Sequence, residues 1–229
     1  YNKARGTEDV MIYEISKIYE KEYNEDSKIT GLLKGNYITN SWSGNKVETD
    51  FYLVKGIVEN ILNYLGFKNR YSFIKCDSSD MHPGISAYIT LDRKNIGIIG
   101  RVHPLICKDD VYVFELSLNS LMSKVKPIKF KTASKFPKIK KDLAFIVKEN
   151  MTSEEIANII KKAGGRLLTN IEVFDVYKGE KLDDGYKSIA YSLTFSSDER
   201  TLSEEEVMKI FENIISKCEK ELDVKLRDK

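Results

Sequence analysis

The chain has 229 residues, of which 41% are hydrophobic and 31% charged, and its formal net charge is +2. This hydrophobic content suffices for packed cores and excludes a disordered chain, and no apolar run approaches the roughly 20 residues of a membrane span. We therefore expect one large or two modest globular domains in the cytoplasm, without an export signal.

The first half of the chain carries strand-like runs and one helix. Residues 11–19 are rich in Ile and Tyr, as strands are, and Asp50 is a good N-cap for a helix over residues 51–65. Apolar and alternating runs predict further strands at residues 29–33, 73–75, 85–91, 96–102 and 111–116. Several antiparallel strands with one long helix predict an α+β sheet domain over residues 1–123.

Lysine is concentrated where the two halves meet. Eight lysines and no acidic residue lie within residues 123–141, together with Pro127 and Pro137. This composition predicts an extended, self-repelling linker over residues 124–136. Both phosphate contact with RNA and a solvated linker are consistent with this local positive charge, and the sequence leaves the choice open.

The second half predicts strands and helices in the order βαββαβ. The predicted strands are residues 142–147, 170–177, 187–196 and 224–226. Capping boxes that begin at Thr152 and Ser203 start the two helices. The order is that of the ferredoxin-like split βαβ fold, in which a four-stranded antiparallel sheet carries both helices on one face. We expect this domain over residues 137–229, with its second sheet face open.

The strand at residues 170–177 supplies the candidate binding residues of the open face. Strand alternation predicts that Phe174 and Val176 point into a core under the helices, while Asp175 and Tyr177 point the other way. An exposed ring can stack on a nucleic-acid base, and a carboxylate can accept from a base amino or imino group. The spacing alone is equally consistent with a solvated aspartate beside a tyrosine that caps the sheet edge.

Cysteine, histidine and tryptophan are sparse. The cysteines form an odd, widely spaced set without a Cys-x-x-Cys pair, so neither a disulfide framework nor a zinc ribbon is expected. Cys218 falls on an apolar helix face. His82 and His103 each precede a proline, and we expect local hydrogen bonds for both rather than metal binding. Trp42, the single tryptophan, is expected to fill a core or an interface.

Five segments of the second half occur in a characteristic order. They are Phe136-Pro-Lys-Ile-Lys-Lys-Asp-Leu-Ala144, Phe174-Asp-Val-Tyr-Lys-Gly179, Lys187-Ser-Ile-Ala190, Leu193-Thr-Phe195 and Asp198-Glu-Arg-Thr-Leu202. Together they resemble the ferredoxin-fold anticodon-binding domain at the end of the β chain of bacterial phenylalanyl-tRNA synthetases. The resemblance implies that this domain holds the anticodon stem-loop of tRNA(Phe), with Asp175 and Tyr177 beside the first anticodon base and Ser188 as a third contact. Candidate phosphate contacts are Lys138, Lys140, Lys141 and Lys178.

Six segments of the first half extend this resemblance. They are Ala4-Arg-Gly-Thr-Glu-Asp9, Tyr13-Glu-Ile15, Asp50-Phe-Tyr-Leu-Val-Lys-Gly56, His82-Pro-Gly-Ile-Ser-Ala87, Gly97-Ile-Ile-Gly-Arg-Val-His-Pro104 and Val113-Phe-Glu-Leu116. They resemble the catalytic-like module of the same β chain, which is a class II synthetase-like antiparallel sheet domain, partial here. The resemblance implies a module without catalytic function that packs against the α subunit of an α2β2 ligase. That subunit uses ATP and Mg²⁺, and our chain is then a C-terminal part of the β subunit with no cofactor of its own.

No catalytic motif in the sequence argues for an active site. Gly97-Ile-Ile-Gly100 is too sparse for a phosphate loop, and the sequence has no Ser/His/Asp set, Cys/His pair or Walker motif. Two other functions stay open, because fold does not fix function. One is an enzyme with its own site in the first half, and the other is a ferredoxin-like regulatory module that binds protein or a small ligand without binding RNA.

Overall fold

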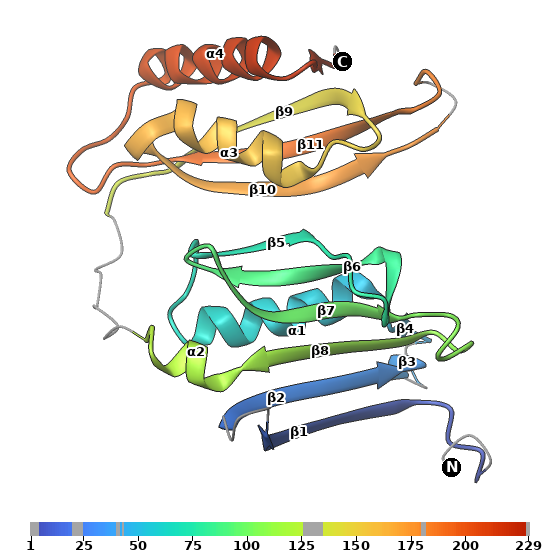
Figure 1. Ribbon diagram of the computed structural model, residues 1–229. Coiled ribbons are helices and arrows are strands. Elements are labelled where there is room, and N and C mark those ends of the chain that lie inside the picture. Colours follow the sequence, from blue (N-terminus) through green and yellow to red (C-terminus); the bar gives the residue numbers. More distant parts are fainter. Residues whose placement is uncertain are drawn as a thin grey trace. The chain divides into compact units, whose positions relative to one another are not determined.

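The computed structural model describes residues 5–19, 25–39, 42, 44–125, 135–179 and 182–227. The chain divides into two compact units, Tyr1–Lys129 and Phe130–Lys229, and each is described by itself (Figure 1). Most of the linker predicted at residues 124–136 lies outside the described residues, so the predicted domain boundaries stay a prediction. Among the described helices, none combines the length and apolar composition needed to cross a membrane.

The first unit is built on a six-stranded antiparallel sheet (Figure 1). Its spatial order is β1 (Val10–Tyr19), β2 (Glu25–Lys34), β8 (Val111–Ser117), β7 (Lys94–Val102), β6 (Met81–Leu91) and β5 (Tyr71–Lys75). Helix α1 (Phe51–Tyr64) begins at the predicted N-cap, where the Asp50 Oδ1 accepts the Leu53 N–H at 2.7 Å. One face of α1 packs into the core of this unit through Val54, Val58 and Leu62. The predicted α+β sheet domain is therefore confirmed.

Three short elements of the first unit were not predicted. They are β3 (Asn36–Thr39) and β4 (Lys46–Glu48), which form a separate two-stranded sheet, and α2 (Leu118–Met122). Each is too short to show a period in the sequence. Of the two positions predicted for Trp42, the core is wrong, since this side chain, between β3 and β4, is 87% exposed, and the interface stays a prediction. Ile38 and Val47 of the same hairpin are exposed as well, at 45% and 39%.

The second unit has the predicted βαββαβ order. Its elements are β9 (Ile139–Lys148), α3 (Ser153–Gly164), β10 (Leu168–Tyr177), β11 (Tyr186–Phe195), α4 (Glu204–Glu221) and β12 (Lys225–Leu226), with a short 3-10 turn at Gly165–Leu167. The antiparallel sheet has the order β10-β11-β9-β12 (Figure 1). In this order the first and third strands of the motif, β9 and β11, are central, and the second and fourth, β10 and β12, form the edges, as in the split βαβ fold. The ferredoxin-like fold class is confirmed.

Alternate residues of the two central strands form the core of the second unit. The strand residues are Leu143, Phe145 and Val147 of β9 and Ile189, Tyr191, Leu193 and Phe195 of β11. Both helices pack on them through Ile156, Ile160, Val207, Ile214 and Cys218. Full burial of one such aliphatic or aromatic side chain contributes roughly 1.5–3 kcal/mol. Since α3 and α4 share this core, the residues that alternate with these core residues along β9 and β11 face the opposite side of the sheet, which no helix covers.

The start of α3 provides a test of local stability. The Thr152 Oγ1 accepts the Glu155 N–H at 3.3 Å, and the Glu155 Oε2 accepts the Thr152 N–H at 2.7 Å, which completes a capping box. We expect Thr152→Ala to lower the free energy of unfolding by about 1 kcal/mol, since the Glu155 N–H loses its acceptor. Urea denaturation measures this loss, and Thr152→Ser, which keeps the hydroxyl, should restore stability. Equal stability of the alanine variant and the parent would contradict the expectation.

Candidate nucleic-acid interface

Strand pairing places the two predicted site residues of β10 on the open face. Asp175 lies opposite Ala190 of β11, and Tyr177 lies opposite Ser188. These two β11 positions alternate with the buried Tyr191 and Ile189, which face the helices. Asp175 and Tyr177 therefore share the helix-free side of the sheet, where Asp175 is exposed and Tyr177 half-buried. Hereafter the open face means this side of the sheet, with Asp175, Tyr177, Ser188 and Ala190.

Two other residues of β10 differ from the expectation. Phe174 and Val176 were predicted to lie in a core under the helices, but they are 57% and 52% exposed. The register shifts between Val173 and Asp175, so a bulge at Phe174 interrupts the alternation. The helices also cannot cover the whole edge strand, because α3 is about 18 Å long and the ten residues of β10 span about 33 Å.

The Tyr177 ring is held between two neighbours. A Cβ atom built on Gly179 would lie 2.6 Å from the Tyr177 Oη and 2.9 Å from its Cζ, so the ring packs closely on the backbone at Gly179. From the last strand, the Arg227 guanidinium carbon lies 5.3 Å from the centroid of the ring. This distance is within the range of a cation–π contact. The Tyr177 ring thus contacts both Gly179 and Arg227.

Ser188 lies under these side chains rather than at the surface. Its side chain is 2% exposed, and its Oγ accepts a hydrogen bond from the Arg227 Nη1 at 3.3 Å. The structure therefore brings Asp175, Tyr177 and Ser188 onto one face, with Ser188 as the buried member. The prediction from the sequence did not include Arg227. The sequence did carry a signal for Arg227. Leu226 packs on the core, and in a strand the residue that follows it must face the other side of the sheet.

The four candidate phosphate-binding lysines fall into two groups. Lys138 and Lys140 are exposed, and Lys140 pairs in register with Thr194. The Lys141 Nζ instead lies 3.1 Å from Glu204 at the start of α4, and the Lys178 ammonium forms a close ion pair with Glu149. The carboxylates of these two pairs offset much of the lysine charge. The structure leaves Lys138 and Lys140 as the more available cations.

Lysine 187 adds a partly buried cation at the start of β11. Its Nζ donates to the Glu149 carbonyl oxygen at 2.8 Å. Burial lowers the pKa of Lys187, and the nearby charge of Lys178 lowers it further. This ammonium joins the start of β11 to the turn after β9, where it satisfies a backbone acceptor.

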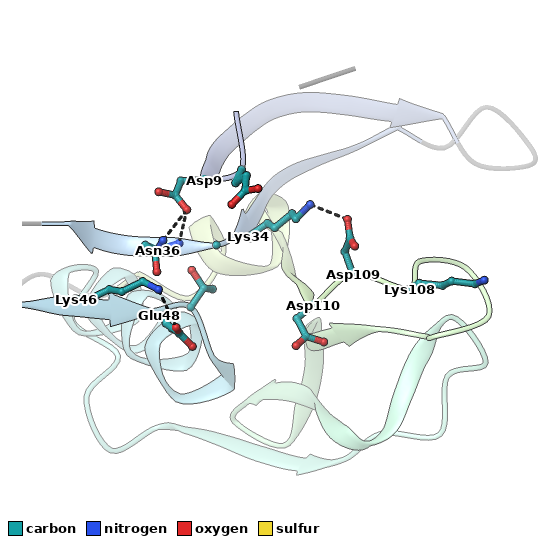
Figure 2. A pocket seen from close by; sticks show the side chains of 11 residues that line it. Asp9, Lys34, Asn36, Lys46, Glu48, Lys108, Asp109 and Asp110 are labelled. Atoms are coloured by element: carbon teal, nitrogen blue, oxygen red, sulfur yellow. Dashed lines mark hydrogen bonds and ion pairs between the residues drawn. The ribbon is translucent and has the colours of Figure 1, made fainter. Parts of the chain in front are cut away.

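A charged pocket of about 530 Å³ in the first unit is the alternative candidate site (Figure 2). Its lining residues are Glu8, Asp9, Lys34, Gly35, Asn36, Lys46, Glu48, Thr49, Lys108, Asp109 and Asp110. Figure 2 shows Lys34 directed at Asp109 and Asn36 directed at Asp9, with distances of 2.7 Å for the ion pair and 3.0 Å for the amide. Lys46 also pairs with Glu48, so these charges mainly satisfy one another. The pocket indicates a structural junction between the start of β1 and the β2–β3 turn.

The remaining titratable candidates have local partners. The His82 Nδ1 accepts the Gly84 N–H at 3.1 Å, and the His103 Nδ1 accepts the Leu105 N–H at 3.2 Å, which confirms the predicted local hydrogen bonds. Cys218 is buried as predicted, and burial raises the pKa of its thiol to about 11. Within the described ranges, no three His, Cys, Asp or Glu side chains are grouped to hold a metal ion.

Comparison with known proteins matches both units. Residues 134–227 match the family described as the ferredoxin-fold anticodon binding domain. Residues 1–118 match the family described as the phenylalanyl tRNA synthetase beta chain CLM domain. These two matches together cover nearly the whole chain.

Similar full-length proteins carry the name phenylalanine–tRNA ligase beta subunit. The chain is 35% identical to that of Geobacillus kaustophilus over 99% of its own length and 30% of the relative. It is 37% identical to that of Bacillus subtilis, with 96% and 28% covered, and 34% identical to that of Listeria monocytogenes, with 99% and 30% covered. The chain therefore spans less than a third of the length of these relatives.

The close approach at Gly179 generates a prediction about Tyr177. We expect Gly179→Ala to displace the Tyr177 ring, because the new methyl group would overlap the phenol end. Stability should change by less than about 0.5 kcal/mol, since the ring can move into solvent. The ring resonances of Tyr177, assigned with Tyr177→Phe, report the displacement. Gly56→Ala is the matched control, because a Cβ there meets no atom within 4 Å. Unshifted Tyr177 resonances in Gly179→Ala would refute the packing.

Proposed function

This chain belongs to the phenylalanyl-tRNA synthetase beta chain family, and we propose that it works as the C-terminal part of a phenylalanine–tRNA ligase β subunit. Its second unit would bind the anticodon stem-loop of tRNA(Phe). One observation carries the proposal: the anticodon-binding family match coincides with a sheet face on which Asp175 and Tyr177 lie side by side, free of the helices.

The proposed mechanism is positioning of the tRNA. The Tyr177 ring offers a stacking surface, and stacking of a base on an aromatic side chain contributes roughly 1–3 kcal/mol. Asp175 is an exposed acceptor two residues away on the same face, suited to a base amino or imino group. A base without that donor would leave the desolvated carboxylate unpaired, which costs free energy and gives discrimination. The anticodon held in this way would direct the acceptor end of the tRNA to an active site on another chain.

The first unit would be a packing module without catalysis. We place the ligase chemistry, with ATP and Mg²⁺, on the α subunit of an α2β2 enzyme in the cytoplasm. The outermost strand β1 is a candidate contact surface for that subunit, because large apolar side chains on it are exposed, among them Ile12, Tyr13 and Ile15. Exposed apolar side chains along an unpaired strand edge are typical of protein contact surfaces.

Backbone contacts would come from the lysines at the start of β9. Lys138 and Lys140 are exposed, and their positive charge would attract the phosphates of the stem-loop. Lys141 and Lys178 would contribute less, since each already pairs with a glutamate. We therefore rank Lys138 and Lys140 above Lys141 and Lys178 as phosphate contacts.

Substitution of the two open-face residues tests the proposal. We expect Tyr177→Ala to weaken binding of the tRNA(Phe) anticodon stem-loop roughly 5- to 150-fold, through loss of stacking. Asp175→Asn should weaken binding and relax the preference for the first anticodon base, with a discrimination of about 1–3 kcal/mol lost. Fluorescence anisotropy with a labelled stem-loop measures both effects. Tyr64→Ala and Glu212→Gln are the controls, exposed on α1 and α4. Binding by the parent that survives both site substitutions unchanged would refute this site.

The salt dependence of the same binding reaction tests the lysines. Each lost phosphate contact should reduce the slope of log K against log salt by about 0.7–0.9. We therefore expect Lys138→Gln and Lys140→Gln each to lower the slope by that amount, whereas Lys141→Gln should lower it less. Lys209→Gln on the exposed side of α4 provides the control. An unchanged slope in both the Lys138 and Lys140 variants would remove these residues from the interface.

A further inference from the structure

Arg227 directly follows the last strand, β12, and its side chain lies at the centre of the open face. The Arg227 N–H donates to the Ala144 carbonyl oxygen at 2.8 Å, which extends the pairing of β12 with β9. Its Nη1 donates to the Ser188 Oγ at 3.3 Å, and its guanidinium carbon lies 5.3 Å from the centre of the Tyr177 ring. Arg227 thus joins β9 through its backbone, and β11 and β10 through its side chain, at the position where a base would stack.

The position of Arg227 is fixed by the core on the other face. Leu226 pairs with Phe145 and packs against the helices, so strand alternation directs the next residue to the open face. The guanidinium contacts a hydroxyl group and an aromatic ring, and neither neutralises its charge. Beside it lies a hollow of about 370 Å³, in which Arg227 is accompanied by one carboxylate and by apolar side chains: Asp142, Leu143, Ala144, Phe174, Ala190, Phe211 and Leu226. A half-buried cation next to free space and a stacking ring is arranged for an anionic ligand.

We propose that Arg227 binds a backbone phosphate of the anticodon loop, next to the nucleotide whose base stacks on Tyr177. A guanidinium has five N–H donors in a planar fork that matches phosphate oxygens, and the hydrogen bond to Ser188 uses one of them. Ser188 then acts as a positioning residue that orients the fork from below. This inference rests on the proposed function, because it requires the RNA to lie on the open face.

A purely structural role is the competing explanation. Arg227 could simply hold the Tyr177 ring and the C-terminal strand in place, with no contact to RNA. Both roles predict weaker RNA binding when Arg227 is changed, so affinity alone does not separate them. The salt dependence does, because only a phosphate contact releases a counterion when it forms.

The experiment compares Arg227→Gln and Arg227→Lys with the parent chain, at several salt concentrations, with the tRNA(Phe) anticodon stem-loop as the probe. We expect Arg227→Gln to weaken binding on the order of tenfold and to reduce the salt slope by about 0.7. Arg227→Lys should keep the parent slope and recover part of the affinity, because it retains the charge and loses the fork. Arg166→Gln, an exposed arginine after α3, should leave both quantities unchanged.

The outcomes separate the inference from the function on which it rests. Parent-like affinity in Arg227→Gln would overturn the inference, and so would weaker binding with an unchanged salt slope. Weaker binding with an unchanged slope would assign Arg227 to the support of Tyr177 alone. Failure of the parent chain to bind the stem-loop would instead overturn the proposed function, and the inference with it. Thermal unfolding of each variant establishes that the chain remains folded, and recovery by Arg227→Lys excludes a general loss of structure.

Discussion

Burial of one face of the four-stranded sheet under α3 and α4 is the constraint on which the candidate site depends. Phe145 and Tyr191 are fully buried in the two central strands, and they fix which side of each strand is inside. A slip of one residue would move Tyr191 into water and Ser188 and Ala190 under the helices. The hydrophobic core therefore sets the register of the strands, and the register places Asp175 and Tyr177 together on the opposite face.

The same constraint explains why the site is buried at its centre and exposed at its edge. Ser188 and Ala190 lie on a central strand and are nearly covered by neighbouring side chains. β10 is an edge strand that outreaches α3, so Phe174 and Val176 remain exposed beside Asp175. The exposed edge strand β10 lies next to the packed ring of Tyr177, so a ligand could reach the site and bind to a preformed surface. Preformed surfaces lose less conformational entropy when they bind.

The first unit uses its sheet in a different way. Helix α1 covers one face through a continuous apolar stripe, and the charged pocket of this unit satisfies its ion pairs internally. Its outermost strand β1 keeps large apolar side chains exposed. These features fit the packing role that we propose for the first unit, and the proposed ligand-binding surface lies in the second unit.

The sequence by itself determined the longer elements and their order, because hydrophobic period, helix caps and turn residues act between near neighbours in the chain. It predicted the helix that begins after Asp50, the capping box at Thr152, the ferredoxin-like order and the shared face of Asp175 and Tyr177. The capping box predicted at Ser203 is only half formed, because the Ser203 Oγ accepts the Glu206 N–H while the Glu206 carboxylate binds Arg200. Only the tertiary structure decided what each side chain meets. The bulge at Phe174, the pairing of Lys141 with Glu204 and the approach of Arg227 to Tyr177 depend on strand register and on helix length relative to strand length. Those contacts join residues far apart in the chain, and no local pattern carries that information.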